Sequence, residues 1–399
     1  MSTRRRHIRV LPPVFLLLAL LTLFVKLRSQ GEYLRSRRTQ VEYNENVLLD
    51  DINNATLGFE KIFVINLPIR TDRKDAMTLA ASFSNLTLNW IDGVSGSTVP
   101  ERTLPLEEYK TPPGESERGS WRAHMNALQA ITENGHASAL IMEDDQDWDL
   151  RLREQLQTFA LGVTTLVQPL RISRGKTQTY ADPSFPEPDA VNKITTITHP
   201  NLPTTIPPSI SPYGDNWDIL WLGHCGMAIP ERATTTHSKG IVILHSDSTV
   251  PGRRDLTTDL KSDGGPNLLR IAYPEHTRLI HHAYRPVCST AYAVSQRGAR
   301  KILYELGVRK YTSQFDNQLR ELCDGEKMRE TRLVCLTSQP SYFSHWRARG
   351  REEKDSDIAE TKGEWRDKGE SVNIRWSVRQ NLGRFVRGEG EWEDQYPDR

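Results

Sequence analysis

This sequence has few cysteines and almost no excess of one charge, and each of these features excludes a class of protein. Four cysteines in 399 residues are too few for a small domain held together by disulfides. The 52 lysines and arginines nearly balance the 51 aspartates and glutamates, so neither a basic protein that wraps nucleic acid nor an acidic disordered chain is expected. A mean hydropathy of −0.57 excludes a protein with many membrane spans. These exclusions leave a globular α/β protein with at most one membrane anchor.

Several catalytic motifs are absent as well. No Gly-x-Gly-x-x-Gly follows an expected strand, and the chain has no Gly-x-Ser-x-Gly, His-Glu-x-x-His or Cys-x-x-Cys. A dinucleotide oxidoreductase, an ordinary serine hydrolase and the common zinc sites are therefore not expected. Gly175-Lys176-Thr177 looks like the end of a phosphate-binding loop, but Leu170 stands where that loop needs its first glycine.

Only one apolar run is long enough to suggest a membrane segment. Residues 10–25 carry no charge, four arginines precede them, and Lys26 and Arg28 follow. The basic flank predicts a cytosolic tail at 1–9, a signal-anchor helix at 10–25, and a single-pass type II protein whose body lies in the lumen of the Golgi or the endoplasmic reticulum. Sixteen residues span only roughly 24 Å as a helix, so a cleaved signal peptide and a cytosolic chain remain alternatives.

The composition of residues 26–399 divides them into three parts. Residues 26–58 are polar and predict a stem, and the globular domain is expected at 59–346. Inside it, residues 168–213 are rich in proline, threonine and serine, which predicts a flexible insertion. Charges dominate from 347 to 399, and this pattern predicts a loosely ordered C-terminal tail.

Strand and helix patterns alternate within the domain. Lys61–Leu67 and Ala139–Met142 are short apolar runs typical of buried strands, whereas 71–83, 119–134 and 151–167 have helical periodicity. This alternation predicts an α/β fold with a doubly wound, mostly parallel sheet.

The densest cluster of carboxylates comes directly after the second of these strands. Glu143, Asp144 and Asp145 would lie at the carboxyl edge of the sheet, where α/β proteins bind ligands. Oxygen ligands suit Mg²⁺ or Mn²⁺, and such an ion can neutralise a diphosphate leaving group. An ordinary acidic turn is the alternative. Asp355-Ser356-Asp357 has similar spacing, but it follows no predicted strand.

Several short motifs, in this order, together resemble glycosyltransferase family 25, which includes lipooligosaccharide and procollagen galactosyltransferases. The resemblance runs from about residue 60 to 360, and its motifs are Ile62–Leu67 with Arg70-Thr71-Asp72-Arg73, Gly119–His124 leading to Ala139–Asp145, Asp218–Gly223, Cys288–Ser295 followed by Gly298-Ala299 and Asp316, Gln339-Pro340, and Ser356-Asp357-Ile358.

The resemblance implies a GT-A-like fold, a UDP-sugar donor with galactose the expected sugar, a glycan or protein acceptor, and inversion at the anomeric carbon. Inversion needs a carboxylate base and a cation on the diphosphate. The roles that follow are Asp316 as the catalytic or acceptor-binding carboxylate; Asp145 with Asp144 as ligands of Mn²⁺ or Mg²⁺; Arg70, Arg73, His124, Glu143 and Asp144 as donor contacts; and His345 and Asp357 as residues that close over the site.

Several of these residues also have a purely structural explanation. The arginines can belong to a solvated helix start, His124 to a helix core, and Asp316 to a helix face. Trp121-Arg122-Ala123 stands where the family usually has smaller residues, which leaves the choice of acceptor open. An inactive glycosyltransferase-like binding partner and another metal-dependent phosphoryl-transfer or hydrolytic enzyme are the competing functions. Cys323 and Cys335 can close a small disulfide loop, or all four cysteines can be buried free thiols.

Overall fold

The computed structural model describes residues 48–398 except 108–111, 173–177, 189–192, 231–236, 258–267, 327–328 and 358–362. The predicted cytosolic tail, the signal-anchor helix and most of the predicted stem therefore lie outside the described residues. Within the described residues, no helix has both the length and the apolar character needed to cross a membrane.

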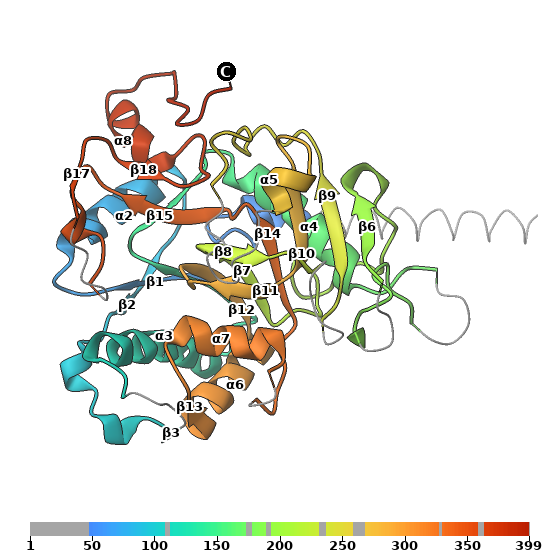
Figure 1. Cartoon of the computed structure of the whole chain (residues 1–399), viewed down its shortest axis with the longest axis horizontal. Coiled ribbons are helices and arrows are strands. Elements are labelled where there is room, and N and C mark those ends of the chain that lie inside the picture. Colours follow the sequence, from blue (N-terminus) through green and yellow to red (C-terminus); the bar gives the residue numbers. More distant parts are fainter. Residues whose placement is uncertain are drawn as a thin grey trace, which may run out of the picture. The chain divides into compact units, whose positions relative to one another are not determined.

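The centre of the domain is a twelve-stranded mixed sheet (Figure 1). Nine of its strands follow the order β2-β1-β4-β12-β7-β14-β10-β9-β6, and β12 and β10 run antiparallel to the other seven. This large, mostly parallel sheet fits the expected GT-A-like fold. The bounds are β1 Lys61–Asn66, β2 Asn89–Asp92, β4 Ser138–Glu143, β6 Thr195–Thr198, β7 Ile219–Gly223, β9 Gly240–Leu244, β10 Arg278–His282, β12 Ala291–Ser295 and β14 Cys335–Gln339.

Helices cover both faces of this sheet, as a doubly wound fold requires. Figure 1 shows α3, α6 and α7 together on one side and α2 and α8 on the other. The longer helices have the bounds α2 Thr71–Phe83, α3 Glu115–Glu133, α4 Leu152–Val167, α7 Phe315–Asp324 and α8 Val378–Val386, and the shorter ones are α5 Leu268–Ala272 and α6 Gln296–Ile302.

The alternation of side chains along β4 divides the core between the two faces. Leu140 and Met142 pack into a cluster with residues of α2, α4 and α8. Ala139 and Ile141 pack into a second cluster with residues of α3, α6 and α7. The strand is apolar at every one of these positions because both of its faces are buried.

The C-terminal segment differs from the loosely ordered tail that the sequence predicts. Strand β15 (Phe343–Arg347) pairs with β5 (Gln146–Trp148) and with β18 (Glu370–Ser371), and α8 packs on α2. The tail is ordered here because Asp147, fully buried, accepts hydrogen bonds from the hydroxyls of Ser371 and Ser377 and from the amide of Arg379. The charged composition of the segment gives no indication of these specific polar contacts.

The predicted insertion also contributes to the fold where it is described. Strand β6 adds to the edge of the main sheet beside β9, and Phe185 and Tyr213 are buried. Asp182, fully buried, accepts from the amide of Gly240 at 2.9 Å. These residues of the predicted flexible insertion thus form part of the sheet and the core, because a few aromatic and polar side chains anchor a segment whose average composition suggests a loop.

The remaining described strands form small pairs or turns around the sheet. They are β3 Leu106–Glu107, β8 Gly226–Ala228, β11 Tyr284–Val287, β13 Lys310–Tyr311, β16 Gly350–Arg351 and β17 Trp365–Arg366. Two disulfides lie near the sheet: Cys225–Cys288 joins the segments that follow β7 and precede β12, and Cys323–Cys335 joins α7 to the start of β14. The predicted Cys323–Cys335 loop is confirmed.

Candidate active site

The acidic triplet lies at the turn between β4 and β5, at the carboxyl edge of the sheet. Glu143 is the last residue of β4, and its amide donates to the carbonyl of Thr290 at 2.9 Å. The carbonyl of Asp145 accepts from the amide of Trp346 at 2.7 Å. Strand pairing on both sides of the turn thus fixes the backbone that carries the three carboxylates.

Glu143, Asp145 and His345 form a cluster around one point. One ligand atom from each lies within 4.8 Å of the other two. His345 Nε2 is 3.7 Å from Glu143 Oε2 and 3.9 Å from Asp145 Oδ1. Their side chains remain 30%, 11% and 20% exposed for Glu143, Asp145 and His345, so the cluster is open to a ligand. The structure thereby joins His345, which the sequence placed only in site closure, to two residues of the triplet.

The charges of the cluster depend on one another. Partial burial raises the pKa of Glu143, and the neighbouring Asp145 and Asp144 carboxylates add to that effect. Burial also acts against ionisation of Asp145, but the positive charges of His345, Arg73 and Arg347 together lower its pKa. The two carboxylates raise the pKa of His345 although burial opposes its protonation. Of the two carboxylates in the cluster, Asp145 is therefore the one whose surroundings favour the ionised form.

Asp144 points away from the cluster. Its Oδ1 accepts from Arg73 Nη1 at 2.8 Å, and its Oδ2 accepts from Asn66 Nδ2 at 2.7 Å. Asn66 ends β1, the neighbouring strand, and also donates to the carbonyl of Arg70 at 3.2 Å. Both oxygens of Asp144 are therefore engaged in holding the start of α2 against the acidic turn.

Arg70 and Arg73 lie beside the same edge, as their position after β1 predicts. Arg70 contacts Asp357 and makes two 3.0 Å bonds to Asp72. Arg73 Nη2 donates to the carbonyl of Asp355 at 2.7 Å. The two guanidinium groups thus connect the acidic turn with the 355–357 segment. The contact with Arg70 places Asp357 next to the site.

His124 lies on the buried side of the cluster. Its ring stacks on Phe315 with centroids 4.2 Å apart, and its Nδ1 is 2.9 Å from the hydroxyl of Tyr292. Nε2 lies 3.9 Å from Glu143 Oε1, too far for a hydrogen bond. Burial lowers the pKa of His124 to about 3, so the imidazole is neutral. These contacts favour the helix-core explanation, with one ring edge facing Glu143.

Asp316 lies at the first turn of α7 next to Phe315. Its carboxylate accepts from the amide of Cys288 at 3.2 Å and from that of Asn317 at 2.8 Å. Within the described part of the chain, no hydrogen bond or ion pair joins Asp316 to Glu143 or Asp145. The structure therefore places Asp316 at the turn that precedes β12, and its neighbour Phe315 stacks on His124, which faces Glu143.

Two further residues at this site were not predicted from the sequence. Arg347 Nη1 lies 4.0 Å from Asp145 Oδ2 and donates to the carbonyl of Asp355 at 3.1 Å. Arg379, from α8, donates to the carbonyls of Asp144 and Gln146, each at 3.1 Å. Both come from the segment dismissed as a tail, and the only available signal was the strand-like run of residues 342–346 before Arg347.

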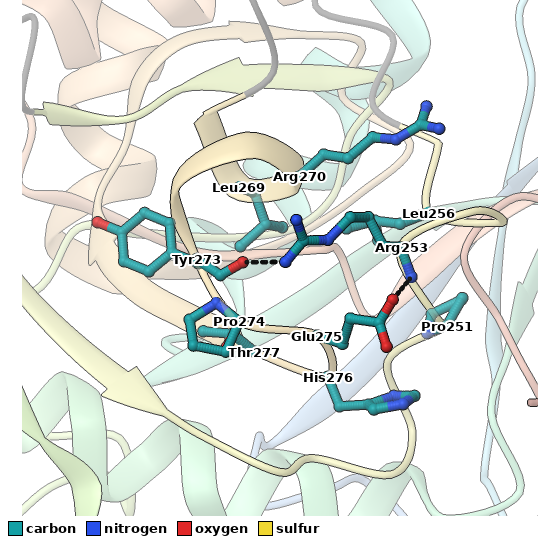
Figure 2. Close-up of a pocket in the computed structure, with 10 residues that line it drawn as sticks. All are labelled: Pro251, Arg253, Leu256, Leu269, Arg270, Tyr273, Pro274, Glu275, His276 and Thr277. Atoms are coloured by element: carbon teal, nitrogen blue, oxygen red, sulfur yellow. Dashed lines mark hydrogen bonds between the residues drawn. The ribbon is translucent and has the colours of Figure 1, made fainter.

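A small pocket lies away from this cluster, between α5 and the segment that leads to β10 (Figure 2). Its volume is about 10 Å³, which is about the least space that holds one water molecule. The amide of Arg253 donates to Glu275 at 3.4 Å, and its guanidinium donates to the carbonyl of Tyr273 at 3.2 Å, as Figure 2 shows. This pocket is too small for a sugar or a nucleotide.

Comparison with known proteins gives a limited relationship. No protein-family model matches the sequence. One stretch of the chain is similar to procollagen galactosyltransferases. It is 26% identical over 113 residues to procollagen galactosyltransferase 1-A of Xenopus laevis, and 27% identical over 112 residues to procollagen galactosyltransferase 1 of Danio rerio. These alignments cover 26% and 25% of this chain, and the chain spans only 18% of the length of each relative. The similarity supports a distant, glycosyltransferase-like relationship.

Proposed function

We propose that this chain is a glycosyltransferase that moves a hexose from a UDP-sugar to a glycan or protein acceptor with inversion. The observation that carries the proposal is the cluster of Glu143, Asp145 and His345 at the carboxyl edge of the sheet, flanked by Arg70 and Arg73. The partial similarity to procollagen galactosyltransferases supports galactose as the sugar. Two disulfides support the proposed lumenal compartment, because disulfides persist in oxidising surroundings.

The cluster has the composition of a divalent-cation site. Two carboxylates and one imidazole are ligands that Mn²⁺ accepts, and Mg²⁺ also binds carboxylates. We therefore assign Glu143, Asp145 and His345 as the residues that would hold the ion, in place of the pair Asp145 and Asp144. Bound there, the cation would neutralise the negative charge of the departing diphosphate.

The residues around the cluster bind and orient the substrates in this proposal. Arg70 and Arg73 present guanidinium groups that can form paired hydrogen bonds with phosphate oxygens, in exchange for their contacts to the 355–357 segment. Asp144 holds Arg73 in place. Asp316 remains our candidate for the carboxylate that accepts the proton of the acceptor hydroxyl. His124, neutral and buried, excludes water from one side of Glu143.

The decisive experiment replaces Asp145 with asparagine. The substitution keeps the size of the side chain and removes its charge, so release of UDP from UDP-galactose in the presence of Mn²⁺ should fall by about 100-fold or more. Asp75→Asn, on the exposed face of α2, is the matched control and should retain activity. Chelation by EDTA should abolish the wild-type activity.

Three results would contradict the proposal. Wild-type protein that binds UDP with Mn²⁺ but never releases it from UDP-galactose would favour the inactive binding partner. Cleavage of phosphate esters without cleavage of the sugar–phosphate bond would favour the phosphoryl-transfer alternative. Full activity of Asp145→Asn would remove the cluster from the mechanism.

A further inference from the structure

A cavity of about 200 Å³ adjoins the acidic cluster and has no role in the mechanism above. Its lining includes His345 and Arg347 of β15, His224, which follows β7, and Thr290, which precedes β12. Cavities that hold drug-sized ligands measure about 300–1,000 Å³, so this one has the size class of a single sugar ring.

The topology places this cavity at the reactive edge of the sheet. Strands β4 and β7 run in the same direction, so His224 after β7 lies at the same edge as Glu143 at the end of β4. Strand β12 lies between them and runs the other way, which brings its preceding residue, Thr290, to that edge. The carbonyl of Thr290 accepts directly from the amide of Glu143 at 2.9 Å. The wall of the cavity is therefore bonded to the backbone of the cluster.

Among the residues that the structure describes, two polar atoms of this lining have no hydrogen-bond partner. His224 Nε2 is 2.9 Å from the carbonyl of Ser338, and a carbonyl only accepts, so Nε2 carries the proton and Nδ1 has a free lone pair. Nδ1 is buried and has no hydrogen-bond partner among the residues that the structure describes. The same holds for Oγ1 of Thr290, a residue that is only 2% exposed. Buried polar atoms without partners cost free energy, which a ligand can recover.

The two atoms are held in place before any ligand binds. A Cβ atom on Gly223 would lie 2.6 Å from Thr290 Oγ1, so only glycine allows the end of β7 to approach Thr290 this closely. The Cys225–Cys288 disulfide ties the residue after His224 to the turn before Thr290. Burial lowers the pKa of His224 to about 4, so its ring serves as a neutral hydrogen-bond acceptor rather than as a base.

We propose that this cavity is a pyranose subsite in which His224 Nδ1 accepts a hydrogen bond from one sugar hydroxyl and Thr290 Oγ1 bonds a second. A polyol suits the wall because each hydroxyl can both donate and accept. The sugar is either the hexose of the donor or a hexose of the acceptor, which share this chemistry. The inference rests on the proposed function, since it assigns the substrate's sugar to the same edge of the sheet.

The test uses the full chain with Mn²⁺ and measures three affinities: UDP and UDP-galactose by calorimetry, and methyl β-galactopyranoside by saturation-transfer NMR. The variants are His224→Leu and Thr290→Val, each of which removes one hydrogen-bonding atom. His224→Gln restores an acceptor and should recover part of the loss. His245→Leu, at an exposed histidine outside the cavity, is the matched control. Thermal unfolding establishes that each variant is folded.

A subsite for the donor hexose predicts that both variants weaken UDP-galactose about tenfold or more while UDP binds as before. A subsite for the acceptor predicts unchanged UDP-galactose and loss of the methyl galactoside signal. Either result supports the inference. Unchanged affinities for both sugars, or equal weakening of UDP and UDP-galactose, would overturn it.

Failure of the proposed function gives a different pattern. If wild-type protein binds neither UDP nor UDP-galactose, the glycosyltransferase proposal fails, and the methyl galactoside measurement then decides the subsite alone: a signal lost in both variants supports it, and no signal overturns it. If wild-type protein binds UDP, but the hexose adds no affinity and the galactoside does not bind, the subsite is refuted and the glycosyltransferase proposal stands.

Discussion

Replacing Arg379 with methionine tests whether the C-terminal segment supports the acidic turn. Arg379 is only 6% exposed, and its guanidinium donates to the carbonyls of Asp144 and Gln146 on either side of Asp145. Methionine has similar length and fills similar space, but it donates no hydrogen bond. The substitution therefore leaves two backbone carbonyls without these donors and preserves most of the packing.

The expected loss of stability follows from those two bonds. A buried carbonyl left unsatisfied costs about 1–3 kcal/mol, and removing the buried charge returns part of its desolvation cost. The free energy of unfolding should therefore fall by about 2–4 kcal/mol. Displacement of a catalytic group by about 1 Å can cost about 100-fold in rate, so UDP release should fall more than stability alone explains.

Urea unfolding gives the free energy, and UDP release from UDP-galactose gives the rate, both measured where the variant is fully folded. Arg384→Met is the matched control, since Arg384 lies on the same helix, is 34% exposed and pairs with Glu389. That variant should lose at most about 1 kcal/mol. If Arg379→Met matches it in both stability and rate, the C-terminal segment does not support the site.

Two further predictions concern His281 and Asp316. Burial lowers the pKa of fully buried His281 to about 3, so the folded state stays neutral while the unfolded state takes up a proton below about pH 6.5. The contribution of His281 to the free energy of unfolding is complete above that pH and is lost as the pH falls. The loss of unfolding free energy caused by His281→Leu, measured by urea unfolding, should therefore shrink by about 2 kcal/mol between about pH 7.5 and pH 5. A loss that stays constant over this range would show that the pKa of His281 is not lowered. Asp316→Asn should slow sugar transfer by about 100-fold or more while retaining UDP-galactose binding, if Asp316 is the base. Lower stability with an unchanged transfer rate would instead make it a support for the Cys288 turn.

The central elements were predictable because their signals are local. The apolar runs at Lys61–Leu67 and Ala139–Met142 correspond to β1 and β4, and the helical periodicity at 119–134 corresponds to α3. The position of the acidic triplet at the carboxyl edge followed from the same runs. Each of these patterns reflects burial on one or both faces of a single element.

The C-terminal segment was not predictable in the same way. Its order depends on contacts to Asp147, more than 200 residues earlier in the chain, and none of them involves an apolar periodicity. Ser371, Ser377 and Arg379 are residues that composition assigns to solvent. Hydrogen bonds between distant polar residues leave no periodic pattern in one sequence. The sequence therefore did not reveal that the C-terminal segment is ordered, nor that its residues Arg347 and Arg379 contact the acidic turn.

The choice between Asp144 and Glu143 as partner of Asp145 was, in contrast, within reach of the sequence. Successive side chains on a strand point to opposite faces, so Glu143 continues the face of Ile141 and Asp144 continues that of Met142. Met142 faces the cluster that contains α2 residues, which is where Arg73 meets Asp144. Treating the triplet as three equivalent carboxylates ignored this alternation. If the same alternation continues past the end of β4, Glu143 and Asp145 lie on one face, and Asp144 lies on the other face, toward Arg73.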